Sequence, residues 1–142
     1  MGSENRRPLS LRDLQALIRR IPFNSSLGIR AVGLHRDGVT IECRLRDDLR
    51  NAAGVLHGGV TATLADVAVG MALARHFGGR RTATTVEMKV NFLRPVTGGK
   101  VLARSRLLRV GSALCVGHVD LFDGEKRRIG AALVTYMLLE RR

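Results

Sequence analysis

One segment constrains the fold of this chain more than any other. Residues 60–75 have the pattern of a helix that ends at Gly78-Gly79, and their side chains are apolar or small nearly all round. A helix without a polar face has to be buried on most sides. The apolar stretch 59–74 has only 16 residues with Asp66 in its middle, whereas a membrane span needs about 20 apolar residues. We therefore expect the rest of the chain to wrap around this helix and expect no membrane insertion.

The rest of the chain has the patterns of strands joined by short turns. Residues 39–45 alternate between apolar and polar, the period of a strand with one buried face. Asp37-Gly38 predicts a hairpin turn between this strand and residues 27–34. Ahead of them, the N-cap Ser10 and apolar residues at helical spacing up to Pro22 predict a short amphipathic helix. Four later strands are expected at 82–93, 101–109, 113–122 and 129–139, with Val86, Met88, Val90 and Phe92 forming the apolar face of the first.

These elements predict an α+β fold in which about six antiparallel strands wrap around one long helix. A chain of 142 residues, 45% hydrophobic, is long enough for one packed domain. We therefore expect a single domain over residues 1–142, with residues 1–9 flexible.

The charge balance points to a phosphorylated partner. The net charge is +12, and 21 of the 24 basic residues are Arg, whose planar group suits phosphate. One Tyr, four Phe and no Trp offer few surfaces for base stacking, which disfavours nucleic acid. Cys43 and Cys115 lack the spacing of a metal or redox motif, and the N-terminus lacks the apolar run of a secretory signal. We expect a cytoplasmic protein.

Asp66 is the first candidate for chemistry. It is the only ionisable residue between His57 and Arg75. A buried carboxylate is costly, so such a residue usually has a partner or a chemical role. The alternative is a helical Asp that reaches solvent or pairs with an arginine.

The second candidate is His57-Gly58-Gly59, at the start of the same helix. The first backbone N–H groups of a helix have no intrahelical acceptor, and the helix dipole adds positive potential there. Such a site can stabilise an oxyanion. The alternative is a flexible Gly-Gly segment with His57 as a cap. Asn51, in the preceding loop, either orients His57 or makes a turn hydrogen bond.

Helix geometry separates the two candidates. His57 and Asp66 are nine residues apart, which corresponds to about 13 Å of rise and about 180° of rotation. If they act together, each site needs residues from two subunits. The sequence therefore predicts a two-fold homodimer with shared active sites.

Two stretches around Asp66 resemble a known family. Residues 51–59 (NAAGVLHGG) and 86–95 (VEMKVNFLRP) look like the PaaI-type acyl-CoA thioesterases of the hotdog superfamily. The resemblance implies a hotdog fold, dimers that pair into a homotetramer, and no metal or prosthetic group beyond the coenzyme A of the substrate.

The resemblance also implies roles for individual residues. Asp66 would be the nucleophile or general base, and the Gly58 N–H would polarise the thioester carbonyl. Asn51 and His57 would position this loop and the sulfur of the substrate. Thr85 aligns with a hydroxyl residue that holds the attacking water, with Thr82 and Thr84 close enough to take that place. Residues assigned to substrate binding are Gly59, Arg94, Arg109, Gly111 and Ser112.

The chemistry of a thioester fits this small set of groups. A thiolate leaves readily, so a carbonyl polariser and one carboxylate suffice. A G-x-S-x-G motif is absent from the sequence. We expect an acyl-CoA thioesterase acting on aryl or medium- to long-chain acyl groups. The alternatives are a non-catalytic acyl-CoA-binding hotdog domain and a hotdog hydratase or dehydratase.

Overall fold

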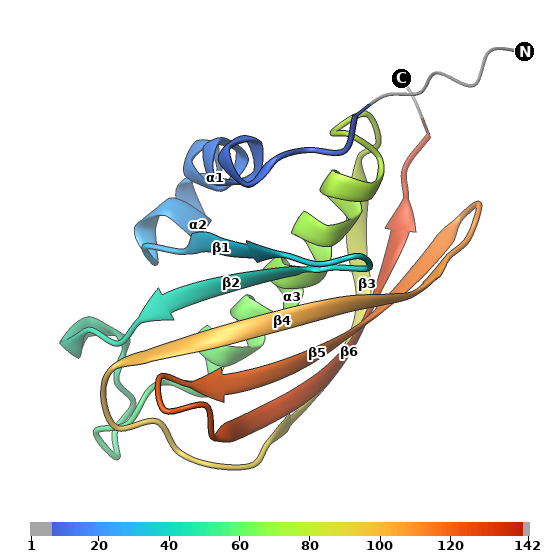
Figure 1. Cartoon of the computed structure of the whole chain (residues 1–142). Helices are drawn as coiled ribbons and strands as arrows, with labels where there is room; N and C mark the ends of the chain where they lie inside the picture. The colour runs from blue at the N-terminus through green and yellow to red at the C-terminus, as the bar shows by residue number, and fades with distance from the viewer. Residues whose placement is uncertain (1–6, 141–142) are drawn as a thin grey trace, which may run out of the picture.

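A six-stranded antiparallel sheet curves around one long helix, α3 (Gly58–His76), in the computed structural model, which describes residues 7–140 (Figure 1). The strand order is β1-β2-β4-β5-β6-β3, and each pair of neighbours is antiparallel. The strands are β1 (Arg30–Leu34), β2 (Val39–Arg44), β3 (Ala83–Phe92), β4 (Lys100–Val110), β5 (Leu114–Asp123) and β6 (Arg128–Leu138). The hotdog architecture expected from the sequence is confirmed.

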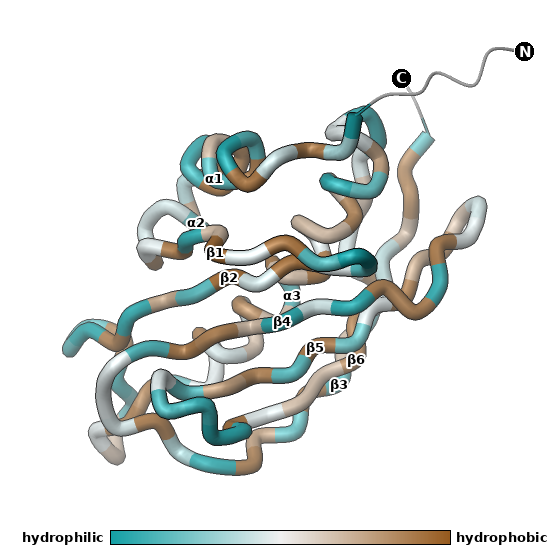
Figure 2. The backbone as a smooth tube through the Cα atoms, in the orientation of Figure 1, coloured by the Kyte–Doolittle hydropathy of each residue, from teal (hydrophilic) through white to brown (hydrophobic). Residues whose placement is uncertain are grey.

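Helix α3 forms the centre of the core. Leu64, Ala68 and Val69 have no exposed surface, and the helix packs against β2, β4 and β5. The brown and white tube of α3 in Figure 2 shows that apolar and neutral residues dominate it. Its close approach to β5 depends on Gly117, where a Cβ would lie 2.7 Å from the Val69 methyl groups. Burying a side chain such as Leu64 contributes about 1.5–3 kcal/mol to the free energy of folding. The buried residues of α3 therefore stabilise its packing against the sheet.

One stripe of α3 is covered less completely. Gly59, Thr63, Asp66, Gly70 and Ala74 are exposed or half-buried, whereas most other residues of the helix are buried. Their spacing of three or four residues places them on one helix face. The described part of the chain thus leaves a face of small residues around Asp66 partly open.

Strand β3 forms one edge of the sheet, and only the middle of its expected apolar face is covered. A bulge lies between Thr85 and Glu87, and Val86 and Phe92, both expected in the apolar face, are 50% and 59% exposed. Met88 and Val90 are half-buried as expected. A bulge inserts one residue and reverses which side chains point inward. Thr85, three positions before Met88, therefore faces α3.

The N-terminal segment forms two helices that pack beside β1 and α3. Helix α1 (Leu11–Arg20) starts with a capping box between Ser10 and Asp13, and it packs against β1. Pro22 ends α1 and also begins α2 (Pro22–Ser26), because proline is favoured in the first turn of a helix. A short 3-10 helix, η1 (Asp47–Leu49), precedes the loop into α3.

The predicted flexibility of residues 1–9 falls mainly on residues 1–6, which lie outside the described range. Among residues 7–140, none of the helices has the length and apolar character needed to cross a membrane.

Candidate active site

Two hydroxyl groups hold one oxygen of the Asp66 carboxylate. Thr85 Oγ1 and the phenol of Tyr136 each donate to Asp66 Oδ1 at 2.7 Å, and the same phenol lies 2.8 Å from the Asp66 backbone carbonyl oxygen. Among residues 7–140, no donor lies within hydrogen-bond distance of Asp66 Oδ2. The half-buried carboxylate thus has one fixed oxygen and one oxygen free to act on a ligand.

Thr85, and neither Thr82 nor Thr84, supplies the hydroxyl group beside Asp66. The β3 bulge turns it toward α3.

Tyr136 is a site residue that the sequence analysis missed. It lies in β6, 70 positions after Asp66, and its side chain is 8% exposed. Gly70, one helical turn after Asp66, makes room for it, since a Cβ there would lie 2.8 Å from the Tyr136 hydroxyl oxygen. A signal was present in the sequence, because Tyr136 is the only tyrosine and Gly70 interrupts an otherwise bulkier helix. Nothing in the sequence indicated that the two residues meet.

The Tyr136 phenol remains protonated over the usual pH range. Burial raises its pKa well above the ordinary value of 10.0. The phenol can therefore donate to Asp66 whenever that carboxylate is charged.

This raised pKa can be measured directly, because the chain has one tyrosine and no tryptophan. In an absorbance titration we expect phenolate to appear near pH 10 in denaturant and at clearly higher pH in the native protein. Because only the unfolded state loses the proton between these two values, the free energy of unfolding should fall as pH rises above about 10, by up to about 1.4 kcal/mol per pH unit. Tyr136→Phe should remove that contribution. A native midpoint at the denatured value would show that Tyr136 is solvated.

His57 is the N-cap of α3, and its ring binds the helix that it starts. His57 Nδ1 accepts a hydrogen bond from the Gly59 N–H at 2.8 Å, so the proton of the neutral ring is on Nε2. The Gly58 N–H has no acceptor within the part of the chain that the structure describes. The α3 dipole adds positive potential at this amide.

The Gly58 end of α3 borders a cavity. It has a volume of about 350 Å³, and its lining includes Asn51, Gly58, Phe92 and Arg94. Gly58, with its free amide, and Arg94 therefore border one cavity.

Asn51 stabilises the loop that leads into α3. Its Oδ1 accepts from the Ala53 N–H at 2.9 Å and from the Val55 N–H at 3.3 Å. These are turn hydrogen bonds, the second of the two roles considered for this residue. None of its hydrogen bonds in the described structure goes to His57.

The other predicted site residues lie beside different parts of α3. Strand β3 runs antiparallel to the helix, with Phe92 beside Gly58 and Thr85 beside Asp66. The β4–β5 hairpin projects on the side of the molecule where α3 ends (Figure 1). Arg109, Gly111 and Ser112 lie in that hairpin, whereas Gly58 lies at the opposite end of α3. One chain therefore does not bring the predicted residues together.

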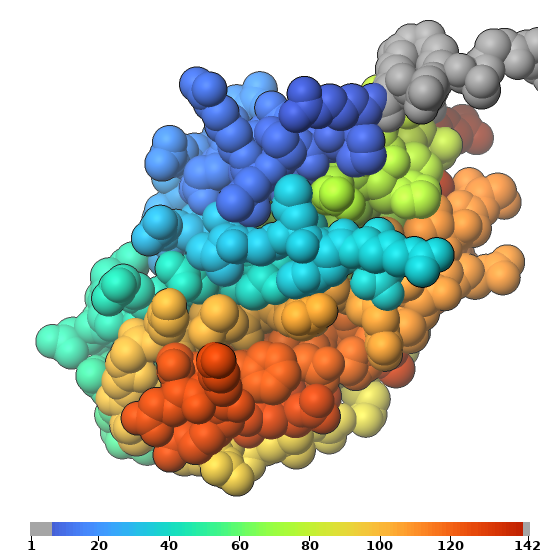
Figure 3. Space-filling view, in the orientation of Figure 1, coloured from blue at the N-terminus to red at the C-terminus, as the bar shows by residue number. Residues whose placement is uncertain are grey.

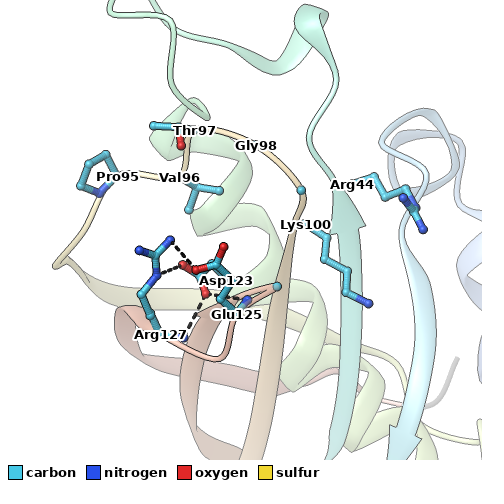
Figure 4. Close-up of a pocket in the computed structure, with 11 residues that line it drawn as sticks. Arg44, Pro95, Val96, Thr97, Gly98, Lys100, Asp123, Glu125 and Arg127 are labelled. Atoms are coloured by element: carbon cyan, nitrogen blue, oxygen red, sulfur yellow. Dashed lines mark hydrogen bonds and ion pairs between the residues drawn. The ribbon is translucent and has the colours of Figure 1, made fainter.

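A further cavity of about 440 Å³ lies beside the β3–β4 connection (Figure 4). Its buried carboxylate, Asp123, accepts from Arg127 Nε at 2.7 Å. Burial alone would raise the pKa of Asp123, but hydrogen bonds from Arg127 and from the Glu125 N–H outweigh it and lower the pKa. The Arg44 and Lys100 side chains point away from this ion pair. None of the predicted site residues lines this cavity.

The comparison with known proteins agrees with this geometry. The model of the thioesterase superfamily matches residues 53–129, more than half of the chain. The chain belongs to this superfamily. The match spans α3 with Asp66, strand β3 with Thr85, and Arg94. The hotdog thioesterase is therefore a thioester hydrolase, as the resemblance implied.

Individual relatives extend the match to nearly the whole chain. The medium/long-chain acyl-CoA thioesterase YigI of Escherichia coli K12 is 30% identical over 87% of this chain and 90% of its own. A thioesterase structure from Haemophilus influenzae superposes with a TM-score of 0.86, at 26% identity, covering 93% of this chain and 92% of the other. A thioesterase family protein of Silicibacter pomeroyi gives 0.83 at 29% identity, covering 90% and 96%.

Proposed function

We propose that this thioesterase hydrolyses acyl-CoA, with aryl or medium- to long-chain acyl groups, in a cytoplasmic homodimer. The observation that carries the proposal is the Asp66 carboxylate. One of its oxygens is fixed by Thr85 and Tyr136, while the other is free. It also lies on the face of α3 that the chain leaves partly open.

In the proposed reaction, water cleaves the C–S bond of the thioester. In the general-base route, Asp66 Oδ2 takes a proton from water, and the hydroxide adds to the thioester carbon. The Gly58 N–H stabilises the resulting oxyanion. The C–S bond then breaks, and the thiolate of coenzyme A takes up the proton. In the nucleophilic route Oδ2 attacks the carbon itself, the C–S bond breaks and the thiolate of coenzyme A leaves. Water then hydrolyses the resulting anhydride to the free acid and restores the Asp66 carboxylate. Both routes use only groups of the chain and no added cofactor.

The separation of Asp66 and Gly58 within one chain supports a shared site. Two α3 helices that pair antiparallel through their stripes of small residues would bring Gly58 of one subunit to Asp66 of the other. In this register residues 58–66 of one helix face the same residues of the other, and there the stripe provides Gly59 and Thr63 for a close approach. Gly70 and Ala74 lie beyond this contact. Strand β3, with the exposed Val86 and Phe92, presents an edge that can pair with its copy. Two such dimers would form the expected tetramer.

The same pairing gives the basic residues a role. Arg94 shares the cavity of Gly58. The antiparallel arrangement would bring that cavity toward the β4–β5 hairpin of the other subunit, with its Arg109, Gly111 and Ser112. The phosphates of coenzyme A are the chemical groups that such arginines recognise.

The direct test measures free thiol released from acetyl-, phenylacetyl-, octanoyl- and palmitoyl-CoA by the purified protein. We expect turnover of at least one of the last three substrates, well above the uncatalysed rate. Tight binding of acyl-CoA without thiol release would instead indicate a non-catalytic domain. Hydration of an enoyl-CoA without thiol release would indicate a hydratase.

Subunit mixing tests the shared site. Asp66→Asn and Gly58→Pro proteins should each be nearly inactive. After equimolar exchange, half of the dimers should be hybrids with one intact site, so activity should recover to about a quarter of the wild-type value. Exchange is checked with two differently tagged subunits, and mixing two Asp66→Asn preparations is the control. Proven exchange without recovery would place both groups of a site in one chain.

A further inference from the structure

We propose that the tail of the acyl chain binds in a groove between α1 and the end of α3, and that Ala16 of α1 limits the chain length that the groove accepts. This inference rests on the proposed acyl-CoA hydrolysis. It adds where the acyl tail binds and which residues select its length.

The groove has a volume of about 510 Å³, and its lining combines apolar and polar surface. Figure 3 shows that α1 (blue) lies against the end of α3 (yellow-green), the two helices that contribute to its lining. Apolar side chains from three elements line it: Leu9, Ala16, Leu17, Ile21, Ala74 and Ala83. The charged side chains in its lining are Asp13, Arg20 and Arg81.

Helix α1 does not use its whole apolar face for the core. The sequence placed Leu14, Leu17, Ile18 and Ile21 on one apolar face. Leu14 and Ile18 are fully buried, but Leu17 is only half-buried and Ile21 is 36% exposed. The two residues that keep exposed surface are those that line the groove. An apolar ligand would cover them.

A seam of small residues joins the groove to Asp66. On α3, Gly70 and Ala74 follow Asp66 at intervals of four residues, and therefore lie on the same face, with Ala74 about 12 Å from Asp66 along the axis. On β3, Ala83 lies two positions from Thr85 and thus on the same side of the strand. Thr85 contacts the carboxylate, while Ala74 and Ala83 both line the groove.

The direction of this seam fits a thioester bound at Asp66. Its carbonyl carbon would lie at Asp66 Oδ2. An acyl chain of medium length would then pass Gly70 and the Tyr136 hydroxyl group beside it, reach Ala74 and enter the groove. Short acyl groups would stop before it. Each methylene buried in an apolar site increases binding about fourfold, so the groove would favour longer chains over short ones.

Ala16 allows a test that leaves the catalytic groups in place. It is an exposed residue of α1 that lines the groove. Ala16→Phe would fill the space of two or more methylenes, whereas Ala16→Ser leaves it open. Ser25→Phe adds the same ring at an exposed position of α2 that does not line the groove. Should Ala16→Phe not fold, Ile21→Trp fills the groove from an exposed position after the end of α1.

The measurement is kcat/KM for butyryl-, octanoyl- and palmitoyl-CoA. We expect Ala16→Phe to lower the value for the long substrates by about tenfold or more, with butyryl-CoA changed by less than about twofold. Ala16→Ser and Ser25→Phe should match the wild type on all three. An equal decrease on all chain lengths, or none, would overturn the inference.

A second readout separates this inference from the proposed function. Decanoic acid, a product analogue that needs no turnover, is titrated into each protein by calorimetry. Weaker binding to Ala16→Phe than to Ser25→Phe supports the groove even if the wild type hydrolyses no acyl-CoA, in which case only the proposed reaction fails. Equal binding to both variants rejects the groove.

Discussion

Asp66→Asn is expected to lower kcat/KM for acyl-CoA hydrolysis by about 10²- to 10⁴-fold. The carboxamide has the shape of the carboxylate, and its oxygen can still accept from Thr85 and Tyr136, which now hold Asp66 Oδ1 at 2.7 Å. It cannot take a proton from water or attack the thioester as an anion. The loss should therefore appear in kcat, while the melting temperature changes little.

Two variants sharpen this experiment. Asp66→Glu keeps the charge but moves it by one methylene, and activity between the wild type and Asp66→Asn is expected. Asp48→Asn removes a carboxylate whose partner is Arg46 on the surface, and should leave activity unchanged. Near-full turnover by Asp66→Asn would exclude both proposed routes.

Gly58→Pro is expected to lower kcat by about 10²- to 10³-fold, because it deletes the amide donor assigned to the oxyanion. The backbone conformation at Gly58 is compatible with proline. Gly58 is the first residue of α3, where proline is favoured, and His57 has φ −63° and ψ 130°, the extended conformation that precedes proline readily. The substitution therefore removes a hydrogen-bond donor with little other effect on the helix.

Gly58→Ala is the matched control, because it keeps the N–H. Its Cβ would lie 3.2 Å from Cε1 of Phe92, a side chain that is 59% exposed and able to move. We expect Gly58→Ala to retain activity within a few-fold of the wild type. If proline and alanine lower kcat equally, steric contact with Phe92 would explain the loss, and the Gly58 amide would have no role in catalysis.

The sequence alone determined the main elements and part of the site. The apolar pattern of residues 60–75 required a buried helix, and the six strands followed from alternation and turn signals. Asp66 was identified because a lone carboxylate in such a helix is costly. His57-Gly58-Gly59 was identified because the start of a helix has free amides. These are local properties, governed by nearest neighbours along the chain and by the helical period.

The tertiary structure decided which distant groups meet. The bulge in β3 turned Thr85 toward Asp66, although simple alternation placed it on the opposite face from Met88. Tyr136 reached Asp66 from β6 only because Gly70 left space beside it. Leu14 and Ile18 of α1 are buried in the core, whereas Leu17 keeps exposed surface and lines the groove beside α1. Such contacts depend on strand register and packing between elements far apart in the chain, and one-residue changes in register reverse them.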